Sequence, residues 1–165
     1  MIIKTPKQRK LEKVFEEIIL TENSSFYRLA YMYVKDSNDA LDILQESILK
    51  AYNNLHTVKD VELIDRWIKR IIANSAIDYI RKNSKLVLVD KIESIEASHY
   101  DRQYEDLYEA LDTLPPELKS IIVLKYFQGY TIEEVGEILE ISTSQVKNKL
   151  HKALELLRIE VKVPS

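Results

Sequence analysis

The chain of 165 residues is long enough for one ordinary domain or for two small helical domains joined by a linker. Its two glycines and four prolines are too few for the tight turns of a β-sandwich, a barrel or a multi-crossover α/β sheet, while 45% hydrophobic and 31% charged residues argue against wholesale disorder. The absence of cysteine excludes disulfides, thiol catalysis and thiolate metal sites, and the net charge of −3 gives no overall attraction to nucleic acid.

The first predicted helix begins after Thr5, with Pro6 at its first position and Gln8 placed to close a capping box. Apolar residues follow at helical spacing, and residues 26–34 are apolar nearly all round, which is typical of a helix enclosed on most sides. The polar residues 36–38 break this pattern. These features predict the centre of a first helical domain.

The next predicted helix is amphipathic. Its buried stripe is expected to comprise Leu41, Leu44, Ile48, Ala51 and Leu55. Its opposite face carries the polar residues Asp42, Gln45, Glu46 and Lys50. By itself, such a face is most simply a solvated surface.

A further helix is predicted after the polar stretch at residues 53–60, with apolar residues at helical spacing up to Ile80. Between residues 66 and 85 lie six basic residues and one acid, Asp78. A second basic island lies at residues 147–158, and the rest of the chain is acidic. Two basic surfaces on an otherwise acidic chain indicate two contacts with a polyanion.

Helical periodicity fails between two predicted domains, at residues 5–83 and 104–161, and we predict a linker at residues 84–103. Its four consecutive apolar residues, 86–89, could form a short strand. A lone strand has no partner for its backbone hydrogen bonds, so an extended segment docked on another surface is favoured.

In the second domain, a first apolar stretch stops at Pro115 and Pro116. The next one ends at Gly129, which fits the position after a helix because glycine adopts positive φ without steric cost. Capping boxes for two further helices are predicted from the pairs Thr131 with Glu134 and Ser142 with Gln145.

Only Glu140 and Ile141 separate these two helices, and this spacing predicts a helix-turn-helix whose second helix enters a DNA major groove. The apolar stripe of the second helix is expected to be Val146, Leu150, Ala153, Leu154 and Leu157. Its free face carries amide, hydroxyl and basic side chains suited to base edges and phosphates. A helical hairpin with a solvated basic face is the alternative interpretation.

No window of about 18 uncharged apolar residues occurs, so we expect no membrane span, and the first ten residues lack a signal peptide. The three histidines, His56, His99 and His151, show no metal-ligand spacing, and no glycine-rich phosphate loop is present. We therefore expect neither a metal nor a cofactor, and no enzymatic activity.

The chain resembles the extracytoplasmic-function (ECF) group of the bacterial sigma-70 family of transcription factors. Four segments in the family's order carry the resemblance: FYRLAYMYVKDSNDALDILQESILKAY at 26–52, DRWIKRIIANSAIDYIRK at 65–82, LDTLPPELKSIIVLKYFQGYTIEEVGEIL at 111–139 and ISTSQVKNKLHKAL at 141–154. The resemblance implies an all-α initiation factor in which a region 2 bundle and a region 4 helix-turn-helix are joined by a flexible linker. Such a factor binds core RNA polymerase and directs it to a promoter.

The resemblance implies that the clamp region of core RNA polymerase binds Asp42, Gln45 and Glu46. It further implies that the −10 element is contacted by Asn54, His56, Arg66, Lys69, Arg70, Asn74, Asp78, Arg81 and Lys82. Basic side chains interleaved with aromatic rings suit single strands, because cations hold the backbone and rings stack on bases. The spacing of Trp67 nevertheless favours the core over stacking, and Asp78 has the alternative role of holding Arg81 or Lys82 in place.

For the −35 element, the resemblance implies contacts from Thr143, Ser144, Gln145, Lys147, Asn148, His151 and Lys152.

Two residues depart from the family's pattern. Gly136 stands where alanine is usual, which lowers helix propensity but permits close helix packing. Glu140 occupies a turn position often held by glycine, where glutamate is unfavourable if the turn needs positive φ.

The resemblance also implies an anti-sigma factor as a partner, and we expect a cytoplasmic protein that this partner could hold near the membrane.

Two other functions stay open. A stand-alone helix-turn-helix repressor would form a symmetric dimer. A structural or protein-binding helical module would not need Lys147, Asn148 or Lys152 for any DNA-dependent activity.

Overall fold

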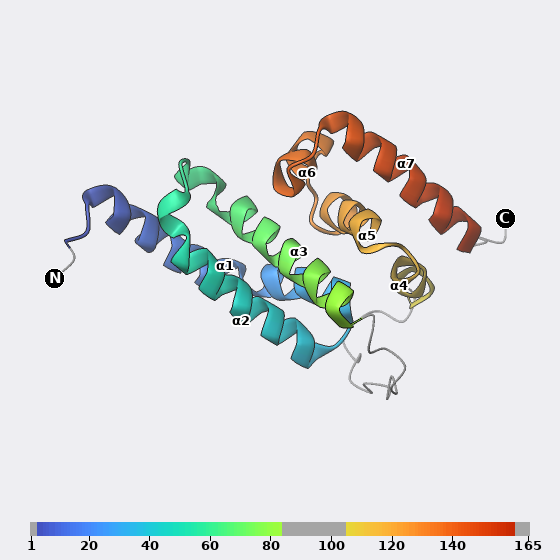
Figure 1. Ribbon diagram of the computed structural model, residues 1–165, viewed down its shortest axis with the longest axis horizontal. Coiled ribbons are helices and arrows are strands. Elements are labelled where there is room, and N and C mark those ends of the chain that lie inside the picture. The colour runs from blue at the N-terminus through green and yellow to red at the C-terminus, as the bar shows by residue number, and fades with distance from the viewer. Residues whose placement is uncertain (1–2, 84–104, 161–165) are drawn as a thin grey trace. The chain divides into compact units, whose positions relative to one another are not determined.

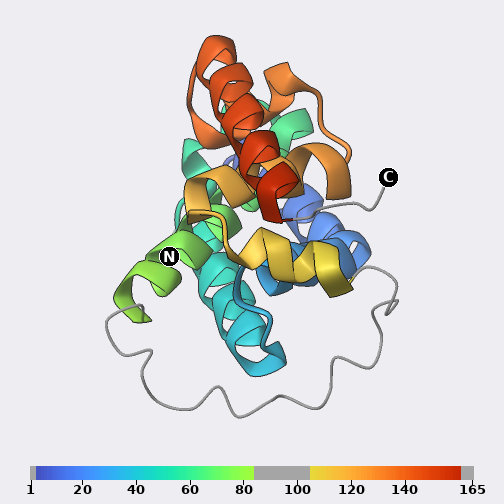
Figure 2. The same ribbon diagram turned by 90° about the vertical axis from the view of Figure 1, so that its right-hand side faces the viewer.

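The computed structural model describes residues 3–83 and 105–160, and these residues form helices without any strand (Figures 1 and 2). The elements in chain order are α1 (Pro6–Val34), α2 (Ser37–Asn53), the 3₁₀ turns η1 (Leu55–Thr57) and η2 (Val61–Leu63), α3 (Ile64–Asn83), α4 (Glu105–Asp112), α5 (Pro116–Ile122), the π-helical turn η4 (Val123–Phe127), α6 (Ile132–Leu139) and α7 (Thr143–Glu160). This confirms the all-α prediction. The predicted linker at 84–103 lies outside the described residues.

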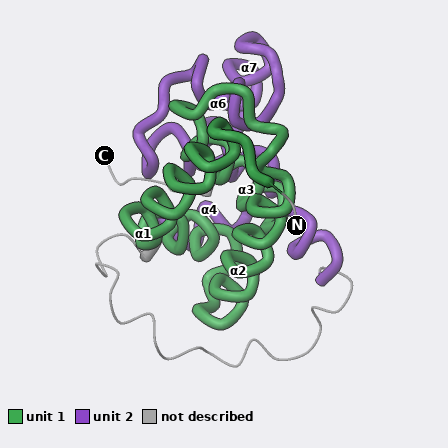
Figure 3. The backbone as a smooth tube through the Cα atoms, turned by 90° about the vertical axis from the view of Figure 1, so that its left-hand side faces the viewer, with its two compact units in different colours: residues 1–76 green, residues 77–165 purple. Residues whose placement is uncertain are grey.

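The chain divides into two compact units, residues 1–76 and 77–165 (Figure 3). The division falls inside α3, which is continuous from Ile64 to Asn83. The predicted domain limits, 5–83 and 104–161, therefore stay predictions. Each unit is described by itself below.

Helix α1 of the first unit begins with the predicted capping box. The Thr5 hydroxyl accepts a hydrogen bond from the backbone N–H of Gln8 (3.2 Å), and the Gln8 side chain accepts one from the backbone N–H of Thr5 (2.8 Å). The helix ends because Lys35 adopts a left-handed conformation (φ 50°) and donates its backbone N–H to the carbonyl of Tyr31 (2.7 Å). Asp36 then caps α2, accepting from the N–H of Asp39 (3.0 Å).

Apolar side chains from α1, α2 and α3 form the core of the first unit. Its largest fully buried members are Phe26, Leu29, Ile43, Ile64, Ile68 and Ile72. Helix α1 packs along α2, and the ring centroids of Phe15 and Tyr52 lie 6.1 Å apart. The two helices are thereby fixed against each other, and so is the solvent-facing side of α2.

The predicted buried stripe of α2 is only partly right. Leu44, Ala51 and Leu55 are buried, but Leu41 is 45% exposed. The helix is rotated so that Ala40 and Ile43, rather than Leu41, face the core. The rotation brings Leu41 onto the polar face.

In the second unit, α5 and α6 both pack on α7. The largest fully buried residues of this unit are Leu111, Ile121, Val123, Leu124, Val135 and Ile138. Lys119 on α5 is only 3% exposed, and its ammonium pairs with the Asp112 carboxylate at 2.8 Å, which offsets the cost of burying the charge. Gly129 has a positive φ of 78° after η4, as its predicted position after a helix requires.

Candidate functional site

The turn between α6 and α7 is as short as the sequence predicts, and both helices are capped (Figure 1). The Thr131 and Glu134 capping box opens α6. The Ser142 hydroxyl accepts from the backbone N–H of Gln145 (3.1 Å), and the Gln145 side chain accepts from the N–H of Ser142 (3.0 Å). These reciprocal bonds fix the start of α7, the part of a helix-turn-helix that reads base edges.

Glu140 makes the turn in the left-handed conformation, with φ 57° and ψ 45°. Its backbone N–H and that of Ile141 both donate to the carbonyl of Gly136, the second at 3.0 Å. A left-handed conformation costs a non-glycine residue roughly 1–2 kcal/mol. The sequence made glutamate unfavourable here on the condition of a positive φ, and the structure meets that condition.

Gly136 lies where α6 meets the turn, and it is buried. A Cβ atom built there would lie 2.9 Å from the carbonyl oxygen of Ile141 and 3.5 Å from Val146. Because the nearer atom belongs to the backbone, no side-chain rotation relieves this contact. Gly136 permits the close approach of α6 to the start of α7, as the sequence predicts.

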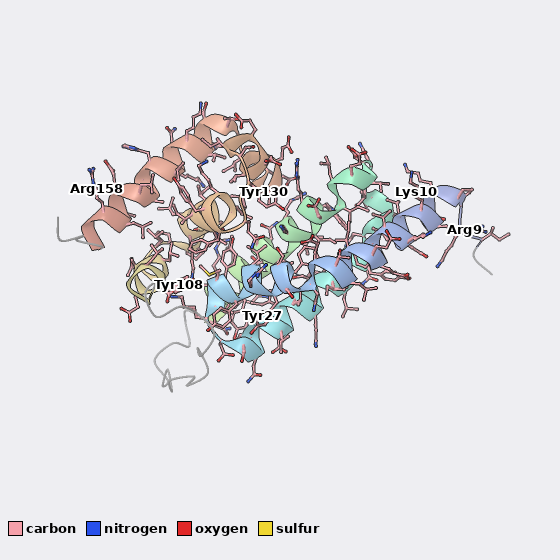
Figure 4. The ribbon with its side chains drawn as sticks, turned by 180° about the vertical axis from the view of Figure 1, so that it is seen from behind. Arg9, Lys10, Tyr27, Tyr108, Tyr130 and Arg158 are labelled. Carbon is pink, nitrogen blue, oxygen red and sulfur yellow. The ribbon has the colours of Figure 1, made fainter. Side chains whose placement is uncertain are left out.

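The outward face of α7 carries the residues predicted to read the −35 element. Its exposed members are Ser144, Gln145, Lys147, Asn148, His151 and Lys152, and Thr143 is half-buried. The opposite stripe is buried at Val146, Ala153 and Leu157. Leu154, predicted in that stripe, is 42% exposed. It directly follows the buried Ala153 and therefore lies about 100° around the helix axis from it. Figure 4 shows Arg158 in the last turn of α7.

The polar face of α2 is exposed as predicted at Asp42, Gln45 and Glu46. Glu46 pairs with Lys50 at 3.1 Å, so its carboxylate stays on the solvent side. Sequence reasoning missed two leucines on this face: Leu41 is 45% exposed and Leu49 is 64% exposed. Their spacing of four residues on either side of Gln45 is the signal that could have found them.

The residues predicted to contact the −10 element differ in exposure. Those that are exposed are Asn54, His56, Asn74, Asp78, Arg81 and Lys82, and those that are half-buried are Arg66 and Arg70. Trp67 is also half-buried, so its ring is neither wholly in the core nor wholly accessible. The exposed residues of α3 lie at helical spacing and give it a face with one amide, one carboxylate and two cations, of which Arg81 pairs with the Glu117 carboxylate.

Lys69 is the member of this set least accessible to a phosphate, being only 6% exposed. Burial lowers the pKa of its ammonium, while the carboxylates of Asp65 and Glu22 act in the opposite direction. The buried position of Lys69 therefore supports a structural role, in which its ammonium interacts with the carboxylates of Asp65 and Glu22 inside the first unit.

The loop between α2 and α3 is shaped by side-chain hydrogen bonds to its own backbone. The Asn54 amide donates to the carbonyl of Lys50 (2.8 Å), and the Thr57 hydroxyl donates to the carbonyl of Asn54 (2.7 Å). Leu55 and Val58 are buried and hold the loop against the core of the first unit. His56 between them is exposed, so the loop presents a polar ring on a fixed backbone.

Within residues 3–83 and 105–160, no group of three or more acidic or histidine side chains is arranged to hold a metal ion. Nor does that part of the chain contain a helix both long and apolar enough to cross a membrane.

Two family models match the chain, Sigma-70 region 2 over residues 21–86 and Sigma-70, region 4 over residues 104–157. The chain is 40% identical over 158 residues to the RNA polymerase sigma factor SigV of Bacillus subtilis (strain 168), covering 94% of this chain and 95% of that protein. It is 29% identical to the ECF RNA polymerase sigma factor SigW of the same organism, covering 98% and 97%. All of the predicted site residues fall within the two matched ranges.

Two solved structures share the fold. One is the sigma factor RpoE in complex with the anti-sigma factor NepR from Bartonella quintana, with a TM-score of 0.74 and 19% identity over 92% of this chain and 98% of that chain. The other is CnrH in complex with the cytosolic domain of CnrY, with a TM-score of 0.69 and 18% identity over 93% and 91%.

Replacing Glu140 by glycine is expected to raise the free energy of unfolding by about 1 kcal/mol, because glycine adopts the left-handed turn without a Cβ clash. Urea titration of the full chain measures the change. The control is Glu137→Gly in the same helix, where right-handed geometry makes glycine unfavourable by about 1 kcal/mol. A loss of stability in Glu140→Gly would contradict the strain inferred for this turn.

Gly136→Ala is expected to lower the free energy of unfolding by about 1 kcal/mol, because overpacking of about 1–3 kcal/mol exceeds the gain in helix propensity of about 1 kcal/mol. The double variant with Glu140→Gly should recover part of the loss, since glycine at 140 lets the turn move. A double-mutant cycle in urea measures this coupling. Additive effects would mean that the two positions do not share one turn geometry.

Proposed function

Because the chain belongs to the extracytoplasmic-function group of the sigma-70 family, we propose that it binds core RNA polymerase and directs it to specific promoters. The observation that carries this proposal is the face of α7, where amides and cations are exposed directly after a capped helix-turn-helix turn. Amides pair with adenine edges, and lysines reach guanine or phosphate. We assign the −35 element to this face.

We assign core polymerase to the exposed face of α2. Asp42, Gln45 and Glu46 supply hydrogen-bonding groups, while Leu41 and Leu49 supply apolar area. Removing exposed leucine surface from water favours association by about 25 cal/mol per Å² of apolar area buried. The combination of a polar centre with apolar flanks fits a protein partner better than a purely solvated face.

We assign the −10 element to the α2–α3 loop and to the exposed face of α3. Here the loop offers Asn54 and His56, and α3 offers Asn74, Arg81 and Lys82. Cations that hold a single-stranded backbone beside accessible polar side chains suit a melted promoter strand. With one contact at the −10 element and another at the −35 element, promoter binding gains from the high effective concentration of the second contact once the first is made.

The reaction itself, synthesis of RNA, would be catalysed by the polymerase, and the protein would work in the cytoplasm where that enzyme acts. The similarity to a sigma factor bound to an anti-sigma factor supports an anti-sigma factor as a further partner. Such a partner would cover the surfaces that bind polymerase or promoter.

The decisive experiment adds the purified chain to core polymerase and a promoter library and sequences the transcripts. Initiation at a defined set of promoters, only when the chain is present, is the expected result. Symmetric dimers that protect paired half-sites without polymerase would favour a stand-alone repressor instead. No specific transcript and no association with polymerase would overturn the proposal.

Gln45→Ala and Leu49→Ala are each expected to weaken capture of core polymerase by about tenfold, because truncating an interface residue costs roughly 1–2 kcal/mol. Lys147→Ala should leave capture unchanged and reduce promoter affinity, with a salt slope lower by about 1. Titration of labelled chain with polymerase, followed by promoter binding at several salt concentrations, separates the two steps. Equal impairment of one step by all three variants would contradict the division of labour.

Arg81→Gln is expected to reduce the salt slope of promoter binding by about 0.7, the value of one phosphate contact on a single strand. Lys69→Gln should leave that slope unchanged, because the ammonium of Lys69 is buried in the free protein. The same salt series measures both variants. A reduced slope for Lys69→Gln would mean that this side chain swings out to reach the DNA.

A further inference from the structure

The first turns of α1 carry positive charge that the promoter contacts proposed above do not use. Five cations lie between residues 4 and 13, against the single acid Glu12. Lys4 pairs with Glu12 at 2.8 Å. The remaining cations are all exposed and form the amino-terminal basic segment, which consists of Lys7, Arg9, Lys10 and Lys13. Within the described part of the chain, none of these four is in an ion pair.

The amino-terminal basic segment begins beyond the packed body of the first unit. Residues 3–10 are all exposed, and burial begins at Leu11. In Figures 1 and 4 the first turns of α1 extend past the end of α2, with Arg9 and Lys10 at this free end. Helical spacing places Arg9, Lys10 and Lys13 opposite the buried Leu11 and Phe15. The charge is therefore presented to solvent.

Lys7 and Arg9 in the first turn are unfavourable for α1 itself, because the helix macrodipole places partial positive charge at the amino-terminal end. Other helices of the chain follow the favourable rule, with Asp39 in the first turn of α2, and Glu133 and Glu134 in that of α6. Helix α1 has no acid in its first turn. Helix stability thus does not account for the basic segment, whereas an anionic ligand would.

The neighbour of this end of α1 indicates which anion is in reach. Helix α1 contacts η1, the turn that carries His56. The Phe15 ring also lies 6.1 Å from that of Tyr52, just before the loop. A strand held at the loop would therefore lie near the helix that carries the basic segment. Arg9 and Lys13 are about 6 Å apart along the helix axis, so the two cations can contact different phosphates of one strand.

We propose that the amino-terminal basic segment binds the phosphates of two or three nucleotides of the single promoter strand next to the bases held at the α2–α3 loop. This inference rests on the proposed function, since it requires the loop to hold a promoter strand. It adds a third cationic contact, in residues that precede the matched region 2 segment at 21–86. Nucleic acid is favoured over an acidic protein surface, because the loop that would hold the promoter strand contacts the helix that carries the segment.

The test uses polymerase holoenzyme assembled with the full chain and a promoter fragment whose −10 region is already opened. The triple variant Arg9→Gln, Lys10→Gln, Lys13→Gln removes three charges and keeps good helix formers. Its promoter affinity near 0.1 M salt is expected to fall by about 10-fold to 100-fold. The slope of log affinity against log salt should shrink by about 2, since each single-strand phosphate contact contributes about 0.7.

A matched pair of single variants localises the effect. Arg9→Gln should reduce the slope by about 0.7, whereas Arg28→Gln, an exposed arginine farther along the same helix, should leave it unchanged. A second arm removes two or three nucleotides from either flank of the opened strand. Wild type and triple variant should then bind equally. The melting temperature of the triple variant should be unchanged or higher, because cations are removed from the positive end of the helix dipole.

Three outcomes would overturn the inference. Unchanged slope and affinity in the triple variant, while Arg81→Gln still reduces the slope, would reject this contact and leave the proposed function standing. Loss of polymerase capture by the triple variant would identify a protein partner for the segment instead. Failure of the wild-type chain to form any specific promoter complex would overturn the proposed function and this inference together.

Discussion

Burial of one apolar stripe on each long helix sets the direction of the functional side chains of this protein. When Ile43 and Leu44 face the core, the opposite side of α2 must carry Gln45 and Leu49 to solvent. The same constraint on α7, with Val146 and Ala153 buried, turns Lys147 and Asn148 outward. Core packing thus determines which side chains are available to a partner, because a helix has only one rotation about its axis that buries its apolar stripe.

The helix-turn-helix shows how local strain and close packing work together. Glu140 holds a left-handed conformation that is unfavourable for it, and Gly136 supplies the space into which the turn folds back. Capping bonds from Ser142 and Gln145 then fix the first turn of α7. The strain is small beside the stability of a folded domain, and the geometry that it maintains exposes the face of α7 that we assign to the −35 element.

Charge distribution, rather than net charge, explains how a chain of net charge −3 can act on DNA. The cations gather on α3, on α7 and in the first turns of α1, while acids occupy much of the remaining surface. Each cationic face alone supplies a weak, salt-sensitive contact. Under the proposed function, contacts made together on one promoter multiply in affinity, and weak binding of DNA by the free protein is then compatible with firm binding once polymerase holds it there.

The sequence by itself determined the all-α class, the capped helix starts at Thr5, Thr131 and Ser142, and the short turn before α7, because capping and helical spacing are local properties. It also identified the family, since the matching segments are long and in order. Only the tertiary structure decided which of several apolar residues are buried. Leu41 and Leu154 share helical spacing with core residues but lie at the edge of the stripe, and Lys69 is covered despite its charge. Those outcomes depend on what packs against each helix, and a pattern along one helix contains no information about its neighbour.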